Sequence, residues 1–300
     1  MTGAGTILQA SAVGAAETIP NASSVTVNAG AVFQLGSGSG AETINALNGA
    51  GTVRTFNGGT FGSGLIVGSA GGSGAFSGAL ENGTAGNPLS LTKSGAGTQT
   101  LSGANTFTGG VIIDGGILNV NADAALGGSA GAVAIRNGAT LQASGTVTSV
   151  RPFTLSTLAG GRIETNGQTV TLDTASTVAG TALEKTGAGT LNLKGTQTYD
   201  ALTTSGGTTN IYTALNNGTQ TSVITANATT NIYASQTLAA LTIGDGVEVT
   251  FGDGLPFAPE PDKGGGLAAL GAGGAVVPEP GALGLLLAGA LGLLGQRRRA

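Results

Sequence analysis

The sequence contains neither cysteine nor histidine in its 300 residues, and only 9% of its residues are charged. Without cysteine the chain has no disulfide framework and no thiolate ligand. Without histidine it lacks the commonest general base and the commonest metal ligand in proteins. Tryptophan is also absent and tyrosine occurs three times, so few aromatic side chains are available as platforms for a sugar ligand. The chain therefore lacks most of the side chains that commonly form a metal site or an acid–base centre.

The charge balance is mildly acidic and uneven along the chain. The formal net charge is −4, with 11 basic and 15 acidic residues. Three of the basic residues are Arg297, Arg298 and Arg299 at the C-terminus, so the body is more acidic than the total suggests. A body without a basic stripe argues against nucleic acid as a partner.

The residues that are abundant are those of strands and tight turns. Glycine accounts for 57 residues, and the apolar residues are mostly aliphatic or β-branched and lie between Thr, Asn and Ser. Disordered chains generally stay soluble through charge, which this chain has little of. The composition therefore predicts an ordered all-β protein.

The body of the chain repeats itself. The tetrapeptide GAGT occurs at 3–6, 49–52, 95–98 and 187–190, at intervals of 46, 46 and 92 residues. Residues 91–108 and 183–200 are identical at nine of eighteen positions, and the alignment places Phe107 opposite Tyr199. A shorter interval of 21 residues separates TTNIYTAL (208–215) from TTNIYASQ (229–236).

A second recurring unit consists of a strand, a glycine-containing turn and another strand. Five segments have this form: 24–35, 111–120, 132–143, 162–172 and 241–251. Each half alternates apolar and polar residues, with Asn, Asp or Gly where a positive φ is needed. Such a unit alone is also the signal of a β-hairpin, so a meander or sandwich stays open as an alternative.

The fixed intervals favour a solenoid over hairpins. A coil of about 21–23 residues suits one turn of a parallel β-helix, and 46 residues suit two. About 255 residues would form about 11 coils, with glycine at the corners. Because neighbouring coils lie about 4.8 Å apart, residues one interval apart should stack. The 21-residue repeat then places Asn231, Ile232 and Tyr233 over the matching residues of the preceding coil, Asn210, Ile211 and Tyr212.

The segment LTKSGAGTQTLSGANTFTGGVIIDGGILNVNADAALG (91–127) resembles the passenger-associated repeat of autotransporter-type bacterial surface proteins. The resemblance rests on its Lys-x-Gly-x-Gly-Thr core, the following Leu-Ser-Gly-x-Asn-Thr-Phe-Thr-Gly-Gly and the closing Ala-Leu-Gly, and it is weaker over 183–202. It implies a right-handed β-helix displayed at or beyond the outer membrane. The first GAGT is already in register and follows no signal peptide, so we expect a truncated gene or a misplaced start codon, with further repeats and a signal sequence encoded upstream.

The C-terminal part differs from the body, which we predict to span 1–254. Residues 255–276 are rich in Pro and Gly without a period, which predicts a flexible linker. Within the last segment, 277–300, the triplet Pro278, Glu279 and Pro280 precedes fifteen uncharged residues (281–295) and the three terminal arginines. This run predicts a short hydrophobic helix of about 22 Å, against about 30 Å of bilayer hydrocarbon.

This C-terminal combination resembles the PEP-CTERM sorting tail of Gram-negative bacteria. The resemblance implies recognition by an exosortase in the inner membrane, cleavage near the motif and onward transport to the cell surface or exterior. The arginines would hold their end of the helix in the cytoplasm as a basic stop. Gly284, Ala288 and Gly292 form a small-residue face suited to contact with another helix, as in a membrane-embedded processing enzyme. The tail would then be a cleavable sorting signal that holds the chain transiently in the inner membrane.

Candidate catalytic residues are few, and we predict no enzyme and no cofactor. Four aspartates are scattered along the chain, and each adjoins a turn or a strand end. They are Asp114, Asp123, Asp173 and Asp200. The sequences around Asp245 and Asp253 supply too few carboxylates for calcium. We interpret the tyrosines at 212 and 233 as stacked rungs. Two hypotheses remain: a structural or adhesive surface protein, and a β-helix that binds or modifies exopolysaccharide.

Overall fold

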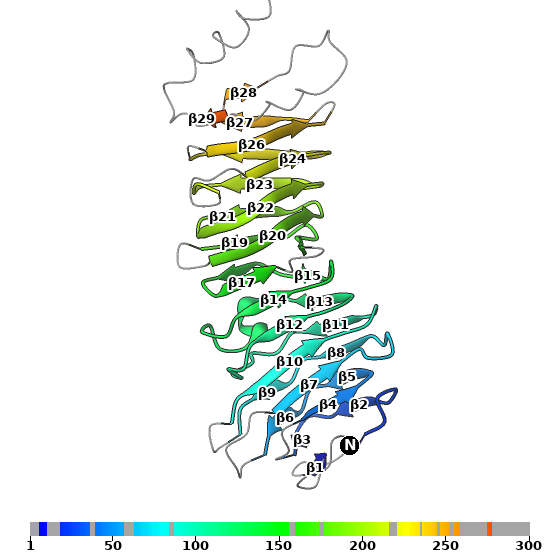
Figure 1. Cartoon of the computed structure of the whole chain (residues 1–300). Coiled ribbons are helices and arrows are strands. Elements are labelled where there is room, and N and C mark those ends of the chain that lie inside the picture. Colours follow the sequence, from blue (N-terminus) through cyan, green and yellow to red (C-terminus); the bar gives the residue numbers. More distant parts are fainter. Residues whose placement is uncertain are drawn as a thin grey trace, which may run out of the picture.

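The computed structural model describes twelve ranges of the chain: 6–10, 19–36, 40–56, 63–83, 87–155, 160–173, 177–215, 221–234, 236–244, 247–251, 255–257 and 275–277. Over them the chain winds into a parallel β-solenoid of about 10 turns. The coils lie one above another along a rod, from the N-terminal end to the last described strands (Figure 1). The predicted solenoid is therefore confirmed.

The strands form three sheets, with four, eighteen and seven strands. The four-stranded sheet contains β1 (Ile7–Ala10), β3 (Val32–Leu35), β6 (Thr52–Thr55) and β9 (Ala79–Glu81). The seven-stranded sheet contains β16 (Val147–Ser149), β19 (Thr169–Leu172), β21 (Thr190–Leu193), β23 (Gly207–Ile211), β25 (Ala228–Ile232), β27 (Val249–Phe251) and β28 (Leu255–Phe257).

The eighteen-stranded sheet holds the remaining strands. They are β2 (Ser24–Val27), β4 (Ala41–Ile44), β5 (Ala46–Gly49), β7 (Ser63–Val67), β8 (Gly74–Phe76), β10 (Leu89–Lys93), β11 (Thr98–Leu101), β12 (Val111–Ile113), β13 (Ile117–Val120), β14 (Val133–Ile135), β15 (Thr140–Ala143), β17 (Pro152–Leu155), β18 (Gly161–Glu164), β20 (Thr177–Thr186), β22 (Thr196–Thr204), β24 (Thr221–Thr225), β26 (Gln236–Ile243) and β29 (Ala275–Val277). One 3-10 helix, η1, spans Asp123–Leu126.

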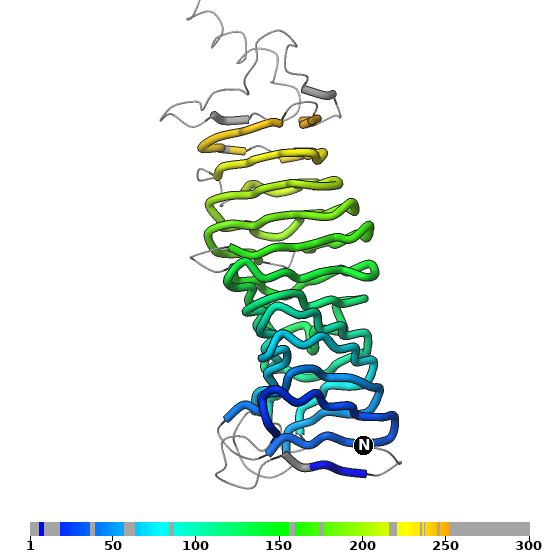
Figure 2. Tube along the Cα trace, turned by 90° about the vertical axis from the view of Figure 1, so that its right-hand side faces the viewer, coloured from blue at the N-terminus to red at the C-terminus, as the bar shows by residue number. Residues whose placement is uncertain are grey.

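Each coil pairs with the next through parallel strands, which Figure 2 shows as stacked turns. Leu91 pairs with Val111 and Val111 with Val133, so the residues of one column are 20 and 22 positions apart along the chain. Side chains alternate between the interior and the surface, because successive residues of a strand point to opposite sides. The inward column continues to Phe153, which is 2% exposed, so the coils share one apolar core.

The stacking predicted for the 21-residue repeat is confirmed. Asn210 pairs with Asn231 and Ile211 with Ile232. The rings of Tyr212 and Tyr233 are stacked, with centroids 4.8 Å apart and planes inclined by 10°.

The hairpin alternative is wrong, although its turns are present. In the turn Arg136–Ala139 the two central residues, Asn137 and Gly138, have φ of 53° and 68°, and the amide of Ala139 donates to the carbonyl of Arg136 over 2.8 Å. These are the features of a turn that can close a hairpin. However, β14 pairs with β12 and β17, and β15 with β13 and β18. The turn is thus a corner between two strands of one coil, each paired with neighbouring coils.

The prediction that residues 46 positions apart stack two coils apart is wrong. Gly49 pairs with Phe76, and Phe76 pairs with Leu101, so residue 101 lies two coils beyond residue 49. The reason is that the coils differ in length: Leu65 and Leu91, which pair directly, are 26 residues apart. A sequence repeat therefore marks recurring corners without fixing which residues stack.

The predicted linker is partly structured. Its first residues form β28, which pairs antiparallel with β27, and β29 pairs antiparallel with β26 from Gln236–Val277 to Leu238–Ala275. The last coil would otherwise present unpaired backbone N–H and C=O groups, which an added strand satisfies. The rest of the linker and the predicted helix 281–295 lie outside the described residues.

Candidate binding surface

The predicted sorting residues lie outside the described part of the chain. They are Pro278, Glu279, Pro280, Gly284, Ala288, Gly292, Arg297, Arg298 and Arg299. Within the described ranges, no helix has the length and hydropathy of a membrane span. The sorting segment and its roles stay predictions.

The lysine of the repeat core closes a corner of the solenoid. Lys93 is fully buried, and its Nζ donates to the carbonyls of Ser94, Gly95 and Gly115 over 2.6, 2.9 and 3.1 Å. Because Gly115 belongs to the next coil, one ammonium joins two coils. Burial lowers the pKa of the Lys93 ammonium from 10.5 to about 8.

The second copy of the repeat core has the same arrangement. Lys185 is also fully buried, and its Nζ donates to the carbonyls of Thr186, Gly187 and Gly206 over 3.1, 2.5 and 2.6 Å. Burial again lowers the pKa to about 8. Both lysines therefore have structural partners in the core, so the lysine of the motif is an anchor of the fold.

The two glycines of GAGT have different roles at this corner. Gly187 has a φ of 78°, which favours glycine. A Cβ on Gly189 would overlap the carbonyl oxygen of Gln168 in the preceding coil. The first glycine thus permits the turn and the second permits close stacking of coils, which confirms the prediction that glycine marks the corners.

A buried ion pair for which the sequence carries no pattern holds the loop after β13. The Arg151 guanidinium is fully buried and binds the Asp123 carboxylate through two bonds, Nε to Oδ1 at 2.9 Å and one terminal nitrogen to Oδ2 at 2.8 Å. It also donates to the carbonyls of Asp123, Leu126, Gly127, Gly128 and Gly131. Asp123 is therefore more than a turn residue, because its carboxylate compensates a buried charge.

The other aspartates of the described ranges lie apart from one another. Asp114 accepts a hydrogen bond from the Asn137 amide at 3.1 Å, Asp173 follows β19, and Asp200 is exposed on β22. Among the described residues, no group of three or more acidic side chains could hold a metal ion. Asp245 and Asp253 are outside the described ranges.

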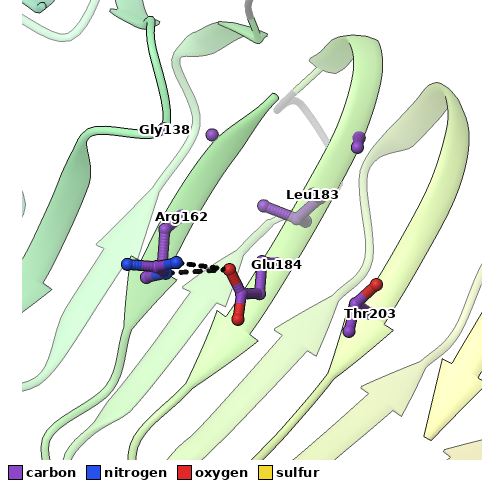
Figure 3. A pocket seen from close by; sticks show the side chains of 7 residues that line it. Gly138, Arg162, Leu183, Glu184 and Thr203 are labelled. Carbon is purple, nitrogen blue, oxygen red and sulfur yellow. Dashed lines mark hydrogen bonds and ion pairs between the residues drawn. The ribbon is translucent and has the colours of Figure 1, made fainter. Parts of the chain in front are cut away.

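A hollow of about 190 Å³ lies on the eighteen-stranded sheet. Arg162 and Glu184 point toward one another across it from β18 and β20, with Thr203 on the next strand and Gly138 at its rim (Figure 3). Arg162 Nε donates to Glu184 Oε2 at 2.9 Å, and Ser205 donates to the other carboxylate oxygen at 3.3 Å. The two charges of the hollow thus pair with each other, and both side chains are substantially exposed.

The outward side of β19, β21, β23, β25 and β27 carries three columns of residues, which we call the amide face. One column is all threonine: Thr169, Thr190, Thr208 and Thr229. The middle column consists of Thr171, Asn192, Asn210, Asn231 and Thr250. The third, directly after the strands, contains Lys194, Tyr212 and Tyr233.

The middle column is a continuous hydrogen-bonded ladder. Asn231 donates to Asn210 at 2.7 Å, Asn210 to Asn192 at 2.8 Å, and Asn192 to the Thr171 hydroxyl at 3.1 Å. At the other end the Thr250 hydroxyl donates to the side-chain oxygen Oδ1 of Asn231. Each amide orients the next, so the side chains of this face are fixed in place before any ligand arrives.

The tyrosine column confirms the predicted rungs and also shows their exposure. Tyr212 and Tyr233 are each 42% exposed, and the Lys194 ammonium lies 5.8 Å from the Tyr212 ring centroid. The facing sides of the two rings cover each other, and both residues remain exposed at the surface. The sequence revealed the stacking through the 21-residue repeat. Extension of the face beyond that repeat depends on register, which the sequence does not give.

Two comparisons with known proteins found a match. A family model described as passenger-associated-transport-repeat matches residues 91–120. A stretch of 57 residues, 19% of the chain, is 51% identical to the adhesin BmaC autotransporter of Brucella suis biovar 1 (strain 1330). This stretch spans 2% of the length of that relative. No solved structure gives a significant match. The chain thus contains the autotransporter passenger repeat that its sequence resembles.

Proposed function

We propose that this chain is an exported, non-enzymatic repeat protein of the cell surface or extracellular matrix, with a structural or adhesive role. The observation that carries the proposal is the passenger repeat at 91–120 within a solenoid of about 10 turns. A rigid rod of stacked coils offers a long surface for contacts with a matrix or with other cells. The adhesin to which part of the chain is similar supports the same role.

Delivery would depend on the C-terminal segment. In this proposal a membrane-embedded exosortase recognises Pro278, Glu279 and Pro280 together with the helix that follows, and cleaves near the motif. The chain would be held transiently in the inner membrane and then released outward. The position of β29 supports this arrangement, because the strand ends at Val277 and cleavage after it would leave the last coil covered.

Mass spectrometry of the exported protein tests the sorting step. We expect a mature C-terminus near Pro278, and an intact tail in the membrane fraction when Pro278, Glu279 and Pro280 are changed to alanine. The chain offers a matched control in Pro259, Glu260 and Pro261, which form the same triplet without a hydrophobic run after it. Alanine at these three positions should leave processing unchanged. An exported protein that still carries Arg297 to Arg299 would refute the sorting role.

Attachment of cells tests the surface role. Cells that export the chain should bind to the matrix formed by their own strain, and cells with the gene deleted should bind less. Equal attachment of both strains, with the protein demonstrably at the surface, would refute an adhesive function. Exopolysaccharide binding is the second candidate, favoured by the outward-facing and nearly uncharged amide face.

A further inference from the structure

We propose that the amide face binds an extended, neutral, hydroxyl-rich polysaccharide that lies along the axis of the solenoid. This inference rests on the proposed surface function and names its partner. The first observation is the supply of hydrogen-bonding groups. A carboxamide has two N–H donors and two acceptor lone pairs, and the ladder uses one of each at Asn192, Asn210 and Asn231. Each amide therefore keeps one donor and one acceptor for a ligand.

The second observation is the regular spacing of these groups. Asn192, Asn210 and Asn231 lie on adjacent strands, so their free groups recur at about the 4.8 Å strand separation. The threonine column repeats at the same interval on one side, and the two stacked tyrosines repeat on the other. A polymer with hydroxyls along its length can contact successive rungs, so that individually weak contacts add along one chain.

The third observation is that the face carries few charges, which favours a neutral partner. Between Thr169 and Thr250 its outward charged residues in the described ranges are Asp173, Lys194 and Glu248. Nucleic acid requires a set of cations against its phosphates, which one lysine does not supply. An insertion surface for lipid would need a broad apolar area, whereas this face consists of hydroxyls, amides and two tyrosines. Polyhydroxylated neutral chains fit these groups best.

The test uses the purified full-length chain and three soluble polymers: hydroxyethyl-cellulose, a galactomannan and the polyanionic alginate. In affinity electrophoresis we expect at least one neutral polymer to retard the protein, and alginate to do so much less. The double variant Asn210→Ala, Asn231→Ala should bind that polymer about tenfold more weakly, because it loses several hydrogen bonds of about 0.5–1.5 kcal/mol each. Tyr212→Ala, which keeps the ladder, should also weaken binding.

The matched control lies on the outward side of the other large sheet. Thr203 and Ser222 are half-buried polar residues of β22 and β24, and changing both to alanine should alter binding less than twofold. Thermal unfolding of each variant checks that the coils remain folded. Retention of full binding by folded amide-face variants, or the absence of retardation by either neutral polymer, overturns the inference. So does a dimer that dissociates in the double variant, because the face would then join two copies of this chain.

This test can fail without refuting the surface function. Cells that display the chain and attach normally, while the purified protein binds neither neutral polymer, would refute only the polysaccharide site. Purified protein that binds through the amide face, while displaying cells attach no better than deletion cells, would refute the adhesive function and retain the site.

Discussion

The two buried lysines show how single residues of the repeat motif hold the coils together. Each ammonium satisfies three backbone carbonyls at a glycine corner, and one of these carbonyls belongs to the following coil. A charge inside a protein is costly unless it is well hydrogen-bonded. The motif therefore pairs lysine with small residues that let the carbonyls converge on its side chain.

The lowered pKa values predict how stability changes with pH. Both lysines have a pKa of about 8 in the folded chain against an ordinary 10.5. Between these values the unfolded chain binds more protons, so the free energy of unfolding rises with pH over this window. We expect this rise to be smaller in the double variant Lys93→Met, Lys185→Met. Urea unfolding at pH 7.5 and pH 10 measures it. Equal pH dependence in both proteins would show that the lysines titrate normally.

Tyr199 predicts a stabilising substitution. It is fully buried, and its hydroxyl has no hydrogen-bond partner among the described residues. Burial also raises the pKa of this phenol. The aligned position of the other repeat carries Phe107, which is buried as well. Because an unpaired buried hydroxyl is unfavourable, Tyr199→Phe should raise the free energy of unfolding by about 1 kcal/mol. The reciprocal Phe107→Tyr should lower it. A destabilised Tyr199→Phe variant would show that the hydroxyl stabilises the fold.

At the scale of elements, the sequence predicted the strands and corners better than their pairing. Asn-Gly between two alternating segments gives the same local turn in a hairpin and at a solenoid corner, as residues 136–139 show. The choice depends on partners about 20 residues away, and only the repeats carried that information. Arg151 had no local signal either, because its carboxylate partner lies 28 positions earlier in a different coil.

The arginine clamp predicts the largest loss of stability from a single substitution. Arg151→Met would leave Asp123 without its partner and several carbonyls of the loop after β13 unsatisfied. Breaking a buried pair in this way costs about 3–5 kcal/mol. Arg162→Met is the matched control, because its ion pair with Glu184 is substantially exposed and contributes about 0–1 kcal/mol. Chemical denaturation compares the two, and a similar loss in both would exclude a special role for Arg151.

At the scale of the molecule, the coils differ in length, so the sequence repeats predicted only in part which residues stack in neighbouring coils. The 21-residue interval between Asn210 and Asn231 coincides with one coil, and the predicted stack was right there. Among the described parallel pairs, paired residues are 17 to 27 positions apart, so the 46-residue interval did not give a two-coil stack. Corner loops absorb extra residues without disturbing the strands. The architecture could therefore be predicted from the repeats, whereas the register of the coils could not.

The last coil carries a prediction about the mature end of the protein. A solenoid that stops abruptly presents an open edge, to which another chain can add. Here β28 and β29 pair with β27 and β26, and both lie before Pro278. A chain truncated after Val277 should therefore stay monomeric, whereas one truncated after Gly254 should form higher oligomers by edge pairing. Light scattering on eluting size-exclusion fractions distinguishes these states. Identical masses per chain in both proteins would show that these strands do not protect the edge. Cleavage near Pro278 would remove the sorting tail and keep both strands. The processed protein would therefore still have the edge of its last coil covered.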